Sequence, residues 1–243
     1  MNNYEYCATW VREQRAARSG RVLDYGCGAG QIVALLRDAG CDAYGCDVFY
    51  DGGDCSTAVP DHLFGSFIRR MQGDSIPFES ASFDIVISNF VLEHVPDIER
   101  VLDEIHRVLK PGGMVLSLFP DRGVWREGHC GIPFLHWFSK GSRVRVYYCA
   151  FMSLVGFGDR RGRAPMTWAA ETCEWLDKWT YYRTRREIRQ AYDSRFHETQ
   201  HIEDHWLRTR LGDRLRPARA LPIGLQRFFV RKLGALALVS RKT

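Results

Sequence analysis

The sequence of 243 residues lacks several features that would assign it to whole classes of protein. Its longest apolar run near the C-terminus, residues 233–239, is much shorter than the roughly 20 residues needed to cross a bilayer. The first 15 residues show no secretory leader. The eight cysteines form no CxxC pair and no zinc spacing with histidine. These absences predict a cytoplasmic protein with free thiols and no bound metal.

Two familiar nucleotide-binding loops are also missing. The glycine-rich segment 22–30 is not followed by the Gly-Lys-Ser/Thr of a phosphate-binding loop. Position 31 is Gln, where a dinucleotide-binding fingerprint would place its third glycine. No internal repeat or low-complexity tract is present. The chain is therefore expected to be an ordinary globular protein with a different kind of ligand.

Charge is distributed unevenly along the chain. Residues 1–120 hold 10 Lys and Arg against 17 Asp and Glu, whereas residues 121–243 hold 24 against 12, so the net charge of +5 conceals a basic second half. Such a half favours an acidic partner, for example a phosphorylated substrate, anionic lipid or nucleic acid. A solvated, arginine-rich surface explains the same charge, and composition leaves both interpretations open.

Strand and helix patterns alternate through the first 120 residues, which predicts a parallel sheet with crossover helices. A capping box at Thr184–Glu187 predicts a later helix that ends near Asp193. Residues 48–63 contain Gly52, Gly53 and Pro60 and are expected to be irregular. Strands are expected at residues 21–24, 43–47, 67–71, 83–88, 114–119, 196–202 and 236–240, and helices at 4–18, 31–39 and 98–109.

The most informative motif is Asp24-x-Gly26-x-Gly28-x-Gly30, which follows a strand and opens a helix. Glycine at alternate positions allows a sharp turn and a close approach of the backbone to a ligand. An acid, Asp47, ends the next strand about 20 residues later. This arrangement predicts a ligand-binding loop with a carboxylate at its side.

The motif resembles the first motif of class I S-adenosylmethionine-dependent methyltransferases. Later segments resemble the same family in order and spacing, and the likeness covers about residues 20–120: they are Gly45–Asp47, Gln72–Phe78, Phe83–Val95 and Arg107–Gly113. It implies an α/β fold with a doubly wound, mostly parallel, seven-stranded sheet of Rossmann-like type. It also implies helical or loop insertions after strand five and between strands six and seven, and S-adenosylmethionine as the cofactor.

The resemblance also assigns roles to individual residues of the cofactor-binding half (residues 1–120), which is called the donor half below. Asp47 would bind the ribose hydroxyls, and Val48 would flank the adenine. Gln72 takes the place of the acid that usually meets the adenine amino group, with Asp74 as the alternative. The full set of implied cofactor-binding residues is Asp24, Gly26, Gly28, Gly30, Asp47, Val48, Gln72, Gly73, Asn89 and Phe90.

Three histidines are candidates for the catalytic base. His94 follows the fourth strand, and His129 and His136 lie among glycines and aromatics after the fifth strand, where loops generally cover a substrate pocket. A structural role is the alternative for each. We expect a single domain over residues 1–243, with a cofactor-binding half (1–120), a substrate-covering insertion (121–170), and a closing helix and strands (171–243) that include a basic insertion (203–232).

The function predicted from these features is methyl transfer to a small-molecule or glycan acceptor, at a hydroxyl group. The chain is similar overall to bacterial methyltransferases found with surface-polysaccharide enzymes, which suggests an anionic or lipid-linked acceptor. The basic insertion predicts peripheral contact with the inner face of a membrane. The alternatives are an RNA methyltransferase and a non-catalytic cofactor-binding scaffold. Asn89-Phe90-Val91-Leu92 lacks the Pro-Pro of amino-methylating enzymes, which argues against nucleic acid.

Overall fold

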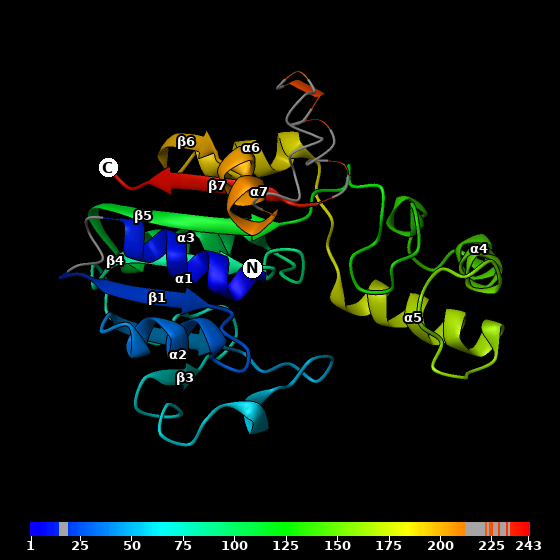
Figure 1. Ribbon diagram of the computed structural model, residues 1–243, viewed down its shortest axis with the longest axis horizontal. Helices are drawn as coiled ribbons and strands as arrows, with labels where there is room; N and C mark the ends of the chain where they lie inside the picture. Colours follow the sequence, from blue (N-terminus) through cyan, green and yellow to red (C-terminus); the bar gives the residue numbers. More distant parts are fainter. Residues whose placement is uncertain (15–18, 212–221, 223, 226–227, 229–231, 233) are drawn as a thin grey trace.

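The computed structural model describes residues 1–14, 19–211, 222, 224–225, 228, 232 and 234–243. Seven strands form one sheet in the order β3-β2-β1-β4-β5-β7-β6 (Figure 1). β7 pairs antiparallel with β5 and β6, and the other neighbours pair parallel. This confirms the predicted sheet. The strands are β1 (Arg21–Tyr25), β2 (Asp42–Asp47), β3 (Ile68–Arg70), β4 (Phe83–Asn89), β5 (Leu109–Phe119), β6 (His197–His201) and β7 (Leu236–Arg241).

The central strand β4 is buried on both faces, as its continuous apolar run predicts. Ile85 and Ile87 pack into one core layer, and Val86 between them packs into the other. Helices cover both faces, so the sheet is doubly wound. The helices of the first layer are α1 (Asn3–Glu13), α2 (Gln31–Asp38) and α7 (Glu203–Leu211), and those of the second are α3 (Ile98–Val108) and α6 (Arg185–Asp193).

Local signals set most helix starts. Asn2 and Glu5 form a capping box on α1, and Thr184 and Glu187 form the predicted one on α6. The expected helix 4–18 is observed over Asn3–Glu13, and residues 15–18 lie outside the described part of the chain. Residues 48–63 are irregular as expected, with one short 3-10 helix, η2 (Ser56–Ala58).

The boundary between α3 and β5 differs from the prediction. The helix ends at Val108, and β5 begins at Leu109 rather than at residue 114. Two pairings account for the difference. Leu109 pairs with Phe83 of β4. Near the C-terminus, Gly112 N donates to Lys242 O (3.1 Å), and Lys242 N donates to Gly113 O (2.9 Å). A partner more than 120 residues away therefore draws the Pro-Gly-Gly segment into the sheet.

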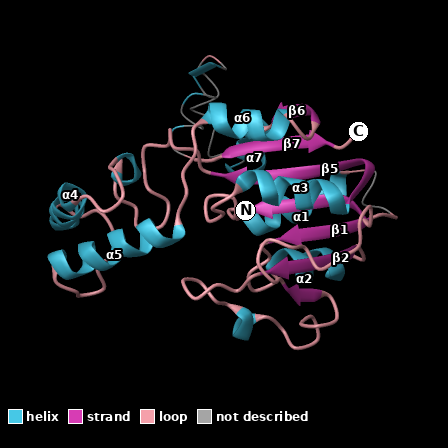
Figure 2. Cartoon of the chain, turned by 180° about the vertical axis from the view of Figure 1, so that it is seen from behind, coloured by secondary structure: helices cyan, strands magenta, loops and turns pink. Residues whose placement is uncertain are grey.

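An insertion after β5 stands off the carboxyl ends of the parallel strands (Figures 1 and 2). It contains η3 (Leu135–Trp137), α4 (Arg143–Leu154) and α5 (Pro165–Trp179). The expected boundary at residue 170 falls inside α5, so the insertion continues through that helix. It has a core of its own, formed by Ile132, Leu135, Cys149, Ala150, Trp168, Ala169, Cys173 and Leu176.

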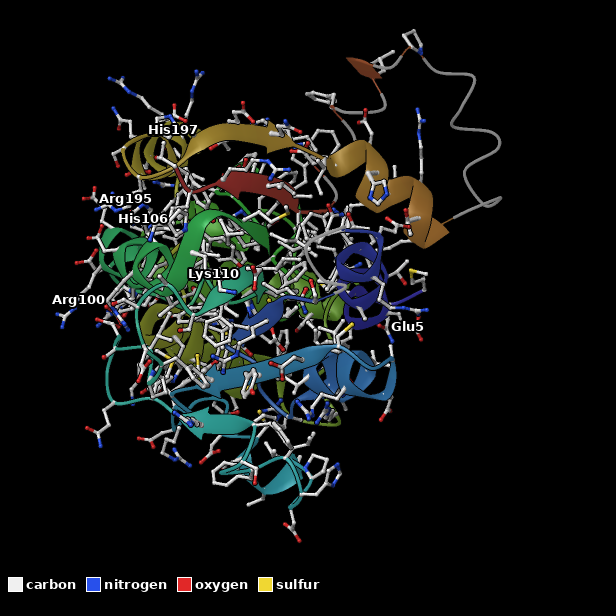
Figure 3. All side chains as sticks on the ribbon, turned by 90° about the vertical axis from the view of Figure 1, so that its left-hand side faces the viewer. Glu5, Arg100, His106, Lys110, Arg195 and His197 are labelled. Carbon is white, nitrogen blue, oxygen red and sulfur yellow. The ribbon has the colours of Figure 1, made fainter. Side chains whose placement is uncertain are left out.

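The opposite end of the sheet is a polar surface with ion pairs (Figure 3). Arg195 binds Asp103 at 2.5 Å, and Lys110 Nζ lies 2.7 Å from Asp84. Arg195 of the basic half thus meets an acid of the first half, whereas Lys110 and Asp84 both belong to the first half; partly exposed pairs of this kind are worth about 0–1 kcal/mol each. In the described part of the chain, no helix combines the length and apolarity needed to cross a membrane.

Candidate functional site

The glycine loop after β1 adopts backbone conformations that favour glycine. Gly26 and Gly30 have φ values of +72° and +78°. A Cβ on Gly26 would lie 2.3 Å from Val91 Cγ2, and one on Gly30 would lie 2.4 Å from Ile68 Cδ1. Side chains are therefore excluded by both strain and space. The backbone of Gly26 and Gly28 stays partly exposed at the carboxyl edge of the sheet, whereas Gly30 is buried.

Asp47 links the end of β2 to this loop. Its Oδ2 accepts from Gly28 N (2.9 Å), and its Oδ1 accepts from Phe49 N (2.7 Å). Each carboxylate oxygen has a further lone pair, so Asp47 can still accept hydrogen bonds from a ligand. Val48, the next residue, is 39% exposed. The structure thus places Asp47 against Gly28 of the glycine loop and leaves the next residue, Val48, exposed; the ribose and adenine contacts stay predictions.

The neighbouring loop brings Gln72 to the same edge. Gln72 and Gly73 follow the end of β3, and Met71 N donates to Asp47 O (2.8 Å), which brings this loop beside the end of β2. Gln72 is exposed. The alternative residue, Asp74, pairs instead with Arg100 at 3.4 Å. This arrangement favours Gln72 over Asp74 as the residue that faces an adenine.

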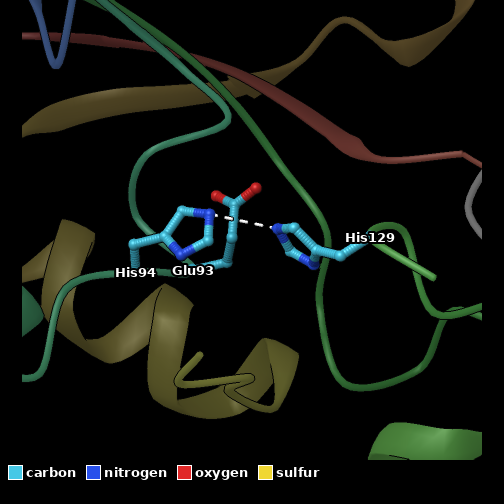
Figure 4. Close-up of side chains that lie close together, drawn as sticks. All are labelled: Glu93, His94 and His129. Carbon is cyan, nitrogen blue, oxygen red and sulfur yellow. Dashed lines mark hydrogen bonds between the residues drawn. The ribbon is translucent and has the colours of Figure 1, made fainter. Parts of the chain in front are cut away.

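Two of the three candidate histidines meet at the insertion side of the sheet (Figure 4). His94 follows β4, His129 follows β5, and their Nε2 atoms are 3.1 Å apart. The His94 Nδ1 faces the carbonyl oxygen of Trp179 at 2.7 Å. The adjacent Glu93 is only 2% exposed. The fold thus joins residues that are 35 positions apart in the sequence.

Glu127 binds the other ring nitrogen of His129, Nδ1. Its Oε1 lies 2.7 Å from His129 Nδ1 and accepts from the Tyr182 hydroxyl, while Oε2 accepts from the backbone N of His129 and of Cys130, each at 2.8 Å. Burial raises the pKa of Glu127, but the hydrogen bonds from His129, Tyr182 and Cys130 outweigh it and hold the pKa at about 2. Glu127 is therefore an anion at neutral pH.

The pKa values of the two histidines are shifted in opposite directions from their usual value, because the negative charge of Glu127 lies beside His129. Burial lowers the pKa of His129, but the bond and charge of Glu127 more than compensate, so the net pKa is raised. Burial dominates at His94 and lowers its pKa. Burial also raises the pKa of Glu93 to about 8. The pair consequently combines one ring that favours the protonated form with one that favours the neutral form.

The third candidate, His136, lies outside this pair. It is 7% exposed, and its ring packs against Tyr182 with centroids 4.6 Å apart. His136 therefore contacts the hydroxyl-bearing ring that binds Glu127. Sequence reasoning gave no role to Glu93 or Tyr182. Glu93 could have been noticed as the neighbour of His94, whereas Tyr182 carries no local signal.

A cavity of about 580 Å³ begins at His129 and extends along α5. Trp168 and Trp175 give it apolar walls, and Arg161 and Arg163 supply positive charge. Each arginine also pairs with an acid of the lining, Arg161 with Asp159 at 3.5 Å and Arg163 with Glu171 at 2.7 Å. The insertion thus offers a partly apolar, partly charged space next to the histidine pair. Its lining residues are His129, Cys130, Asp159, Arg161, Arg163, Trp168, Glu171, Thr172, Trp175 and Leu176.

Comparison with known proteins shows which protein family residues 23–117, within the donor half, resemble. Residues 23–117 match a family model described as a methyltransferase domain. The chain also aligns over 99% of its length with all of an S-adenosylmethionine-dependent methyltransferase from Mesorhizobium loti, with a TM-score of 0.55 and 18% identity. Residues 23–117 thus carry a methyltransferase domain, and the chain has the class I fold of S-adenosylmethionine-dependent methyltransferases.

Two curated methyltransferases are similar to part of this chain at moderate identity. A malonyl-[acyl-carrier protein] O-methyltransferase of Enterobacter lignolyticus is 33% identical over 102 residues, which cover 41% of this chain and 39% of that protein. A ubiquinone biosynthesis O-methyltransferase of Pseudomonas aeruginosa is 32% identical over 112 residues, covering 44% and 47%. The matched segments therefore cover less than half of these relatives and less than half of this chain.

The methyltransferase domain has buried polar groups that suit the cofactor of its family. Asp24 Oδ1 and Asn89 Oδ1 are buried without a hydrogen-bond partner among the residues that the structure describes. Burial, with the negative charge of Asp47, raises the pKa of Asp24. Buried oxygens of this kind are normally paired. S-adenosylmethionine carries hydroxyl and amino groups that can donate to such oxygens, so the residues fit it.

Proposed function

We propose that the chain transfers the methyl group of S-adenosylmethionine to a hydroxyl group of a small-molecule acceptor. The observation that carries this proposal is the His94–His129 pair, which lies beside the insertion cavity at the carboxyl edge of a methyltransferase sheet. The two relatives described above are O-methyltransferases by name, which supports an oxygen atom as the acceptor.

The donor half would hold the cofactor through its loops. The glycine loop gives backbone access, Asp47 binds the ribose hydroxyls, and Gln72 faces the adenine. Asn89 and Phe90 follow β4 and would border the methionine end. Phe90 has a φ of +57°, held by a hydrogen bond from its N to Leu118 O (2.7 Å). When bound, S-adenosylmethionine supplies a methyl group on an activated sulfonium.

The histidine pair would act on the acceptor. Methyl transfer to a hydroxyl group requires in-line positioning and removal of the hydroxyl proton. The facing Nε2 atoms of His94 and His129 can take and share that proton, and the anionic Glu127 stabilises the imidazolium that forms. Tyr182 holds Glu127 in place, and His136 packs on Tyr182. Trp168 and Trp175 would exclude water from the acceptor.

Incubation with methyl-labelled S-adenosylmethionine tests this function. The full chain is expected to label hydroxyl compounds from a panel of phenols, aliphatic alcohols, sugars and sugar phosphates, with the label on oxygen by mass spectrometry. Amines and RNA of matched concentration serve as competing acceptors. Labelling confined to RNA would favour the nucleic-acid alternative. Cofactor binding without transfer to any acceptor class would favour a scaffold.

An anionic or lipid-linked glycan is the second acceptor class that we propose. Arg161 and Arg163 lie in the wall of the cavity, where they can meet a phosphate or carboxylate. The malonyl-[acyl-carrier protein] relative acts, by its name, on an acyl-carrier-linked acid, which also places negative charge on an acceptor. Sugar phosphates in the panel distinguish this class from neutral alcohols.

We also propose peripheral contact with anionic lipid through the basic insertion 203–232. Most of this segment lies outside the described residues. Within the described part, Trp206 is 4% exposed and belongs to the core, so it is no membrane anchor, whereas Leu225 and Phe228 are 45% and 46% exposed. The segment would lie in the interface without spanning it, which fits a cytoplasmic protein at the inner membrane face.

Vesicle sedimentation tests this contact. At low salt we expect the protein to pellet with vesicles that contain phosphatidylglycerol, and to be released as salt shortens the Debye length. Neutral phosphatidylcholine vesicles are the control, and no pelleting is expected with them. If the protein stays in the supernatant with anionic vesicles at low salt, the membrane contact is wrong.

A further inference from the structure

The hydrogen-bond partners of His94 and His129 settle which ring nitrogens carry hydrogen. The Trp179 carbonyl oxygen can only accept, so the His94 Nδ1 that faces it must be the donor. The His129 Nδ1 likewise donates to the carboxylate of Glu127. In their neutral forms, both rings therefore present unprotonated Nε2 atoms to each other across 3.1 Å. Two lone pairs at that distance repel unless a positive charge lies between them.

A third donor atom lies at the same place. Glu93 is 2% exposed, and its Oε2 has no hydrogen-bond partner among the described residues. One oxygen of Glu93 and one ring nitrogen of each histidine all lie within 4.8 Å of one another (Figure 4). A carboxylate buried without a partner is costly. A cation bound here would remove both the lone-pair repulsion and the isolation of the carboxylate.

We propose that Glu93, His94 and His129 bind one divalent cation, with Zn²⁺ as the ion that matches the donors best. Two imidazole nitrogens and one carboxylate oxygen form a common three-residue zinc set that leaves a fourth position open. The separation of 3.1 Å between the nitrogens is close to the edge of about 3.3 Å expected for a tetrahedron with bonds of about 2.0 Å.

The surrounding contacts are those that orient metal-binding histidines. Ligating imidazoles normally donate their other ring N–H to a carboxylate or a backbone carbonyl. His129 meets this pattern through Glu127, and His94 meets it through Trp179. Both Nε2 atoms are thereby held toward one point before any ion binds. The sequence gave no metal-ligand spacing because the donors come from two segments, joined only by the fold.

A role of the cation in methyl transfer would extend the proposed function, and only that role rests on the proposed function. With a cation bound, both Nε2 atoms would be ligands and could not take the hydroxyl proton; the open position of the cation would instead hold the acceptor hydroxyl and make it more acidic. Cation binding itself is measured without any transfer reaction. Failure of the site and failure of the methyl-transfer proposal can therefore be told apart.

The experiment uses the full chain after removal of metals with a chelator. Zn²⁺ is titrated by calorimetry, bound metal is counted by elemental analysis, and Co²⁺ is used as a probe whose visible spectrum reports tetrahedral coordination. We expect one equivalent of Zn²⁺ and a tetrahedral Co²⁺ spectrum. His94→Ala, His129→Ala and Glu93→Gln should each weaken Zn²⁺ binding by about 100-fold or more. His62→Ala, which removes an exposed histidine far from the cluster in sequence, should bind as the parent does.

Several outcomes would overturn the site. Absence of stoichiometric Zn²⁺, or equal binding by the parent and the three cluster variants, contradicts it, and binding of Mg²⁺ alone contradicts the assignment to zinc. Circular dichroism and S-adenosylmethionine binding of every variant confirm that each is folded. Intact S-adenosylmethionine binding with no Zn²⁺ binding would refute the cation site and leave the methyl-transfer proposal standing.

Discussion

The variant His129→Ala is expected to lower the rate of methyl transfer by about 100- to 10,000-fold, the usual contribution of a positioned acid–base group. The physical reason is the loss of an Nε2 atom that faces His94 and is supported by Glu127. Affinity for S-adenosylmethionine should stay at the parent value, because the donor loops are separate from this side chain. Label transfer to the best acceptor gives the rate, and calorimetry gives the affinity.

Three further variants make this result specific to the pair. His62→Ala is the matched control and should transfer at the parent rate. His136→Ala is expected to have a smaller effect, because it acts only through its packing on Tyr182. Glu127→Gln removes the anion that raises the pKa of His129, so the rising limb of the pH–rate profile should move to lower pH. Unchanged turnover in both His129→Ala and His136→Ala would exclude both residues as the base.

The variant Asp47→Ala is expected to weaken binding of S-adenosylmethionine and of its demethylated product by about 10- to 150-fold. This range corresponds to the loss of a charge-assisted hydrogen bond worth about 1.5–3 kcal/mol. The parent is expected to bind both compounds with a micromolar dissociation constant. The carboxylate also holds Gly28 N and Phe49 N, so its removal loosens the loop as well. Calorimetry with both compounds measures the change.

Two controls separate the ribose contact from general loss of charge. Asp42→Ala removes an exposed acid at the start of the same strand, where it pairs with Arg21 and Arg37, and should leave binding unchanged. Asp47→Asn keeps one acceptor oxygen but not the charge, and should fall between the parent and Asp47→Ala. Parent-like binding by Asp47→Ala would rule out the ribose assignment.

Several structural features of the donor half could be predicted from the sequence. The glycine loop, the strand-end acid Asp47 and the continuous apolar strand at residues 83–88 were all predicted, and the sheet confirms the strand assignments. These features depend on neighbours within a few positions: a turn that requires glycine, or a strand buried on both faces. The capping box at Thr184 and Glu187 was predicted for the same reason.

Predictions were less accurate where distant segments meet. The start of β5 moved to Leu109 because Leu109 pairs with Phe83 of β4 and the penultimate residue, Lys242, pairs with Gly112 and Gly113. The insertion continued beyond residue 170 because α5 packs its apolar residues against α4 in a separate core. Neither partner is visible in a local window of sequence, so periodicity alone could not place these boundaries.

By itself, the sequence determined the methyltransferase sheet, the donor loop and the residues that border it, because each depends on local backbone preference and strand burial. It also named His94 and His129 as separate candidates. Only the tertiary structure decided that these two rings face each other at 3.1 Å, with Glu93 beside them and Glu127 behind. That arrangement depends on where the loops after β4 and β5 lead and on how α5 presents its last carbonyl to His94. Such contacts arise from packing between segments far apart in the chain, which no spacing within either segment encodes.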